Sequence, residues 1–116
     1  MNKIAMPLDP ASTKPAPHAP LGDDKTFELA GMFKMLGDPS RLRIVIETLT
    51  GPHPVGEIAK RLGLSVSLVS HHLRLLRAAR LVTADRRGKQ IFYTIHDRHV
   101  AHVINDMIAH VHEETA

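Results

Sequence analysis

The sequence predicts a mainly α-helical domain with one small β-hairpin, an α+β arrangement, and two observations support this prediction. From residue 25 onward, apolar residues recur every three or four positions in segments separated by short turns, which is typical of packed amphipathic helices. In the C-terminal third, two runs rich in β-branched and aromatic residues flank a glycine turn, as in a hairpin. The 116-residue chain contains no cysteine, so we expect neither disulfides nor thiolate metal sites.

The first 24 residues differ in composition from the rest, because they hold five of the eight prolines among small and polar residues. Such a segment buries too little apolar area to offset the entropy lost on ordering. We expect residues 1–24 to be a flexible arm and residues 25–114 to be one domain. The sequence has no membrane-length apolar run and no signal-peptide core, so we also expect a cytoplasmic protein without a membrane partner.

Two helices are predicted directly after the arm. Apolar residues between positions 27 and 36 mark the first, and Gly37 suits the left-handed conformation that follows many helix ends. Asp38 is the expected N-cap of the second helix, which continues to residue 49. Pro39 would occupy its first position, where a backbone N–H is not needed.

A helix, a tight turn and another helix follow. The run "VGEIAKRL" (residues 55–62) predicts a short helix, and Gly63 with Leu64 predicts a turn into Ser65, an expected N-cap. The apolar face of the next helix is expected to enter the core and comprises Val66, Val69, Leu73 and Leu76. Its other face carries side chains that can bond phosphates or base edges in a major groove. These candidate DNA-contacting residues, with the N-cap, are Ser65, Ser67, Ser70, His71, Arg74 and Arg77.

Two strands, residues 81–84 and 90–95, are predicted on either side of "DRRGK", where Gly88 permits the chain to reverse. The tip carries three more candidate DNA contacts, Arg86, Arg87 and Lys89. Taken alone, the helix after Ser65 could be an ordinary solvent-exposed helix, and the basic hairpin tip could be an ordinary solvent-exposed turn. Six basic residues and one acid lie between Arg74 and Lys89. Together and in this order, the features predict a winged helix-turn-helix that binds double-stranded DNA.

Three stretches of the sequence resemble one family: "FKMLGDPSRLRIV", "VGEIAKRLGLSVSLVSHHLRLLRAARLV" and "RRGKQIFYTI". They resemble the ArsR/SmtB family of bacterial metal-responsive repressors, over about residues 25–113. The resemblance implies a homodimer that binds an inverted-repeat operator upstream of metal-resistance or efflux genes and leaves it when metal binds. The family's second metal site requires cysteines, so we expect that site to be absent here.

The stretch "HDRHVAHVINDMIAHVHEE" (residues 96–114) predicts a final helix that has an apolar stripe, five histidines and four carboxylates. His99 and His110 lie eleven residues apart, so they share nearly one face but are separated by about 16 Å. Ligands of one zinc ion must each lie about 2 Å from it. The two histidines therefore cannot share a metal within one chain, whereas antiparallel pairing with a two-fold related copy would create two identical sites.

Each site is expected to combine Asp97 and His99 of one subunit with His110 and Glu113 of its partner. This spacing resembles the C-terminal-helix zinc site of the ArsR/SmtB family residue by residue. Nitrogen and oxygen donors favour Zn(II) or Co(II), and Ni(II), which usually takes more ligands, is the competitor. The histidines that could add such ligands are His18, His102 and His112. His102 and His112 also fit ordinary solvated side chains.

Two other classes of function are alternatives to a metal-responsive repressor. A winged-helix regulator with a non-metal inducer would carry the same fold with solvated histidines. A small metallohydrolase is disfavoured, because neither a His-Glu-x-x-His spacing nor a nucleophile constellation is present. We therefore expect a regulator and no enzymatic activity.

Overall fold

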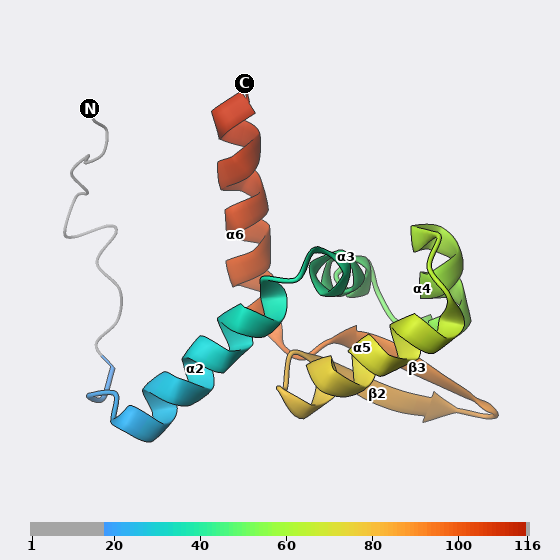
Figure 1. Ribbon diagram of the computed structural model, residues 1–116, viewed down its shortest axis with the longest axis horizontal. Coiled ribbons are helices and arrows are strands. Elements are labelled where there is room, and N and C mark those ends of the chain that lie inside the picture. Colours follow the sequence, from blue (N-terminus) through green and yellow to red (C-terminus); the bar gives the residue numbers. More distant parts are fainter. Residues whose placement is uncertain (1–17, 116) are drawn as a thin grey trace.

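The computed structural model describes residues 18–115, which form helices around a small antiparallel sheet (Figure 1). The helices are α2 (Asp23–Leu36), α3 (Pro39–Thr48), α4 (Val55–Leu62), α5 (Val66–Ala78) and α6 (Arg98–Thr115). The strands are β1 (His53–Pro54), β2 (Val82–Arg87) and β3 (Gln90–Ile95). Most of the expected arm lies outside the described residues, and its last two residues, Asp23 and Asp24, belong to α2.

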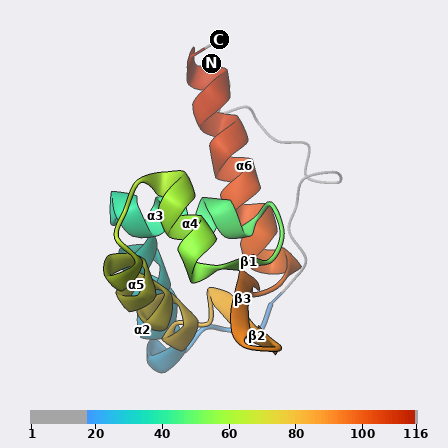
Figure 2. The same ribbon diagram turned by 90° about the vertical axis from the view of Figure 1, so that its right-hand side faces the viewer.

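The arrangement is a winged helix-turn-helix, as the sequence predicted. The strand order is β1-β3-β2 with antiparallel pairing, and β2 with β3 forms the hairpin that extends beside α5 (Figure 1). Helices α2 and α6 project from the body on the side away from the hairpin tip, and α6 rises above the other helices (Figure 2). No helix among residues 18–115 combines the length and the apolar character needed to cross a membrane.

The core lies where α3, α4 and α5 meet the base of the hairpin. Its fully buried side chains come from each of these elements and include Ile44, Val45, Ile58, Val69, Leu73, Leu76 and Val82. Full burial of each such side chain contributes about 1.5–3 kcal/mol. Val66 was wrongly predicted to join them. It is 51% exposed, because it occupies the first position of α5, one turn before the buried stripe begins at Val69.

The predicted helix caps are confirmed at Asp38 and Ser65, whose side chains accept hydrogen bonds from the backbone N–H groups of Arg41 and Leu68, each at 3.0 Å. Gly63 adopts the left-handed conformation, with φ of 68°. The prediction for Gly37 was wrong, since its φ is −72°. Only two residues separate α2 from α3, and the chain continues through Gly37 in a right-handed conformation.

The first hairpin strand was predicted at residues 81–84, whereas β2 begins one residue later and ends three residues later. The structure pairs Val82 with Ile95 and continues the ladder to Arg87 opposite Gln90. Backbone hydrogen bonds extend the strand through its charged residues, which an apolar pattern cannot reveal. The reversal itself is confirmed at Gly88, with φ of 66°.

Candidate DNA-binding surface and metal-ligand pairs

The helix-turn-helix places the predicted contact residues on the exposed side of α5. Ser67, His71, Arg74 and Arg77 are exposed, and Ser70 is half-buried. Ser65 is exposed as well, but its hydroxyl accepts the hydrogen bond that caps α5. Small side chains at the start of α5 and arginines further along leave the helix able to approach a major groove closely.

Next to His71, α5 holds a buried histidine, His72, whose ring centre lies 5.8 Å from that of His71. His72 is 8% exposed, and its Nδ1 has no hydrogen-bond partner within the described part of the chain. Burial, and then the Arg41 guanidinium nearby, lower the pKa of His72 below its usual value. The imidazole is therefore neutral at neutral pH, and it lies close to Asp38 and Arg41 at the start of α3.

The hairpin tip carries Arg86, Arg87 and Lys89, all exposed as predicted. Arg87 is the most constrained of the three. Its Nε donates to the Asp85 carboxylate at 3.0 Å, and its guanidinium lies 4.9 Å from the centre of the Phe92 ring. Asp85 and Phe92 were not predicted as part of the site, because Asp85 was placed in the turn and its pairing with Phe92 depends on the strand register that the structure shows.

Other basic residues near the helix-turn-helix are engaged within the protein. Arg61 donates hydrogen bonds to the carboxylates of Glu57, at 2.7 Å, and Glu47, at 3.2 Å. The hydrogen bond to Glu47, followed by the one to Glu57, raises the pKa of Arg61. Arg43 donates to the carbonyl of Leu62 at the end of α4, at 3.0 Å. These arginines hold α3 and α4 together.

Asp97 immediately precedes α6 and caps it. Its Oδ1 accepts from the N–H of Val100 at 3.0 Å, and its Oδ2 lies 3.1 Å from His96 Nδ1. The hydrogen bond from Val100, followed by that from His96, lowers the pKa of Asp97. The side chain is therefore a carboxylate at neutral pH, and each oxygen keeps a lone pair that suits a divalent cation.

The four predicted metal ligands fall into two pairs. Asp97 and His99 lie at the start of α6, and His110 and Glu113 lie near its end; all four are exposed. No group of three or more potential ligands comes together within the described residues of one chain. Of the additional candidates, His102 is exposed, His18 lies 2.7 Å from the carbonyl of Ala19, and His112 lines a groove between α3 and α6.

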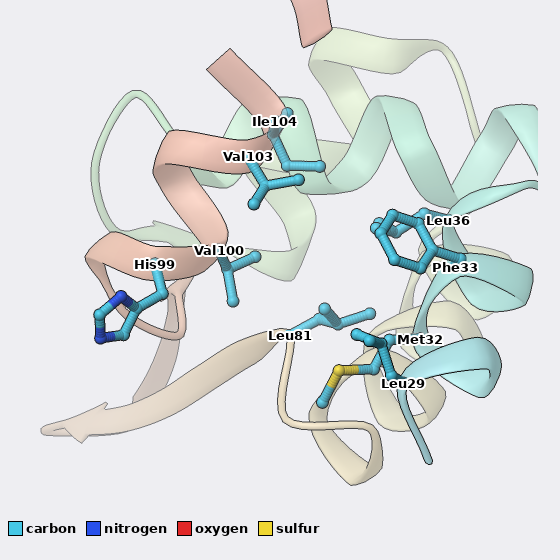
Figure 3. A pocket seen from close by; sticks show the side chains of 9 residues that line it. All are labelled: Leu29, Met32, Phe33, Leu36, Leu81, His99, Val100, Val103 and Ile104. Carbon is cyan, nitrogen blue, oxygen red and sulfur yellow. The ribbon is translucent and has the colours of Figure 1, made fainter. Parts of the chain in front are cut away.

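An apolar surface continues from α6 onto α2. Its exposed side chains are Leu29 and Phe33 of α2 and Val103, Met107 and Val111 of α6. Between the two helices lies a pocket of about 210 Å³ whose lining is apolar except for His99. His99 lies at the rim, and its ring points away from the apolar side chains (Figure 3). The pocket therefore belongs to the same surface as one of the ligand pairs.

Known proteins match both the sequence and the fold. Residues 38–84 match the model of the bacterial regulatory protein, arsR family. The HTH-type transcriptional regulator NmtR of Mycobacterium tuberculosis is 40% identical over 94 residues, which are 81% of this chain and 78% of the relative. A transcriptional repressor SmtB homolog of Synechocystis sp. is 36% identical over 90 residues, 78% of this chain and 68% of the relative.

Solved structures agree with these matches. The solution structure of apo-NmtR superposes with a TM-score of 0.69 at 37% identity and covers 88% of this chain and 86% of its own. A homodimeric winged helix-turn-helix DNA-binding domain from Mycobacterium bovis is described as a possible ArsR-family regulator. It superposes with a TM-score of 0.70 at 28% identity, over 84% of this chain and 92% of its own. This chain therefore belongs to the ArsR family of bacterial DNA-binding transcriptional regulators, and it is not an enzyme.

Proposed function

We propose that this regulator is a metal-responsive repressor. As a metal-free homodimer it binds an inverted-repeat operator, and binding of Zn(II) across the paired α6 helices releases it. Co(II) and Ni(II) are the other ions that its nitrogen and oxygen donors fit. The observation that carries the proposal is the placement of two ligand pairs at opposite ends of one helix whose apolar side is exposed.

The exposed apolar surface of α2 and α6 supports dimerisation. Phe33, Met107 and Val111 are each more than half exposed in the single chain. Contiguous apolar surface of this kind usually marks a protein interface. A second copy is the occupant that the ligand pairs require, and the relative from Mycobacterium bovis is described as homodimeric. The dimer therefore accounts for the apolar surface and the divided ligands together.

Antiparallel pairing of α6 would bring Asp97 and His99 beside the partner's His110 and Glu113. Two-fold symmetry then produces a second, identical site. The donor chemistry fits: the Asp97 carboxylate is ionised and the histidines are exposed. When bound, Zn(II) would tie one subunit's pair to the other's, with four nitrogen and oxygen ligands in tetrahedral geometry.

A short backbone route connects the start of α6 to the end of α5. The N–H of Leu81 donates to the carbonyl of Leu76 in α5 at 2.9 Å, and the carbonyl of Leu81 accepts from His96 at 3.0 Å. Leu81 is also 2% exposed and lines the pocket beside His99. A shift of Asp97 and His99 on metal binding would therefore reach the DNA-contacting helix. The apo state must hold DNA more tightly than the metal state for release to follow.

Fluorescence anisotropy tests the proposal. The full-length protein is titrated onto labelled DNA from immediately upstream of its own gene, first with chelator and then with excess zinc. We expect high anisotropy without metal, a fall with zinc, and recovery with chelator. His110→Ala should bind DNA and ignore zinc, whereas Asn105→Ala, altered at an exposed position of the same helix that is in no candidate ligand set, should respond as the wild type does. Zinc-indifferent DNA binding by the wild type would rule the metal response out.

A second candidate is a regulator whose inducer is a small apolar molecule. The pocket of about 210 Å³ between α2 and α6 favours it, because eight of its nine lining residues are apolar. The two candidates differ in their dependence on His99. If the inducer is apolar, the His99→Ala protein should still be released from DNA when the inducer is added. If the inducer is a metal, this variant should stay bound to DNA in the presence of zinc.

A further inference from the structure

The wing contains one arginine whose side chain the protein holds in place. Asp85 and Arg87 lie two residues apart on β2, so their side chains share one face of the hairpin. Phe92 on β3 is the cross-strand partner of Asp85. The Nε–Oδ2 hydrogen bond of 3.0 Å and the ring contact at 4.9 Å therefore act on the Arg87 guanidinium from two neighbouring positions. Each contact is weak at an exposed site, but both restrict the same group.

The other two basic residues of the tip lack this support. Arg86 makes one long hydrogen bond, of 3.4 Å, from Nη1 to the carbonyl of Gly88 in its own turn. Lys89 occupies the second position of that turn and is exposed. Both residues supply positive charge that can adapt to a phosphate. Only Arg87 combines an ion pair with contact against an aromatic ring.

The presence of Asp85 needs an explanation on a DNA-facing hairpin. Its carboxylate side chain is 63% exposed and would repel phosphates, so it lowers the general affinity of the wing for DNA. A carboxylate that binds Nε leaves both Nη groups of the arginine free to donate. Asp85 therefore weakens the general attraction of the wing to DNA but fixes the orientation of the Arg87 guanidinium.

We propose that Arg87 is the sequence-reading residue of the wing, and that Asp85 and Phe92 are positioning residues that aim it into a narrow, A·T-rich minor groove beside the half-site that α5 contacts. This inference rests on the proposed operator binding. The hairpin extends beside α5 (Figure 1), so its tip reaches the groove that flanks the major groove holding that helix. Narrow A·T minor grooves concentrate negative potential and attract an inserted arginine. Arg86 and Lys89 contact phosphates without regard to sequence.

The test is selection from a pool of randomised DNA duplexes by full-length apo-protein in chelator, followed by sequencing. The variants are Arg87→Lys, with Arg86→Lys as its matched control, and Asp85→Asn. Wild type should enrich an inverted repeat flanked by A·T pairs. Arg87→Lys keeps the charge but not the planar group, so it should lose the flanking A·T preference and keep the central repeat. Arg86→Lys should keep both.

Asp85→Asn provides a readout that a purely structural role would not produce. The variant should bind all duplexes more tightly, because a negative charge is gone. At the same time its A·T preference should fall about two- to fivefold, the range expected for loss of an exposed ion pair. Thermal unfolding of each variant checks that the hairpin is folded.

Three results would overturn the inference: no flanking A·T enrichment by wild type, unchanged enrichment by Arg87→Lys, or equal losses from Arg86→Lys and Arg87→Lys. If no sequence is enriched at all, the proposed operator binding fails instead. The two failures are therefore distinguishable within one experiment.

Discussion

Asp38 illustrates how one side chain defines the start of a helix that supports the DNA-contacting surface. Its carboxylate accepts from the N–H of Arg41 at 3.0 Å, while Pro39 occupies the first helical position. Asp38→Ala should lower the free energy of unfolding by about 1 kcal/mol, the usual effect of losing an N-cap. Asp38→Asn retains the accepting oxygen and should remain close to wild type. Urea unfolding followed by circular dichroism measures both, and equal losses would contradict the capping role.

His72 makes the stability of the fold depend on pH. Burial and Arg41 lower its pKa in the folded state, so the unfolded chain binds the proton first as the pH falls. Its contribution to stability is therefore complete above about pH 6.5 and is lost as the pH falls from there through the lower pKa of the folded state. Between pH 7.5 and 5.5, the free energy of unfolding of His72→Gln should fall by less than that of the wild type.

Urea unfolding at the two pH values, in chelator, measures this dependence. His71→Gln, which alters the exposed neighbour, is the matched control and should retain the wild-type decrease. The account of His72 fails if the His72→Gln and wild-type proteins lose the same free energy on acidification.

Arg80, just after the end of α5, has a left-handed backbone conformation that was not predicted from the sequence. Arg80 has φ of 60°, in the left-handed region that favours glycine. The N–H of Arg80 bonds to Arg77, and that of Leu81 bonds to Leu76, which is the arrangement of a Schellman motif. Arg80→Gly should therefore stabilise the protein by about 1 kcal/mol. Arg77→Gly, inside the helix, should destabilise it by a similar amount, and a stability loss in both variants would contradict the interpretation.

The elements themselves were largely predictable, and the exceptions have physical causes. Helix α4 was predicted with its observed bounds because Gly63 stops it in a left-handed conformation. The caps at Asp38 and Ser65 were read from side chains that act within one helical turn. Gly37 and the first hairpin strand were misjudged because tight chain connection and backbone pairing decide them, and neither depends strongly on residue type.

In the whole molecule, the apolar surface of α2 and α6 should control assembly. Met107 is 57% exposed near the middle of α6. Met107→Glu should convert the dimer to a monomer, because it places a carboxylate in the proposed interface. Met107→Leu preserves the apolar surface and should remain dimeric. Analytical ultracentrifugation distinguishes the species, and a Met107→Glu protein that is still dimeric would contradict this interface.

The candidate sites were predictable to different degrees. The exposure of most candidate DNA-contacting residues was predictable, because helix and strand periodicity determines which side chains share a face, and their contact with DNA stays a prediction. The metal-ligand pairs were read from spacing, but their meeting requires a second chain and stays a prediction. The roles of Asp85, Phe92 and Leu81 became visible only with the structure, since they depend on cross-strand register and on backbone hydrogen bonds between elements.

The most direct test of the central claim is zinc titration of mixed dimers. One protein carries Asp97→Ala and His99→Ala, and the other carries His110→Ala and Glu113→Ala, so neither homodimer contains a complete site. After the two are unfolded together and refolded, each mixed dimer should regain one high-affinity zinc site, because one intact pair from each chain meets there. If mixing restores no zinc binding although mixed dimers form, the ligand pairs do not meet across subunits and the proposed metal site is wrong.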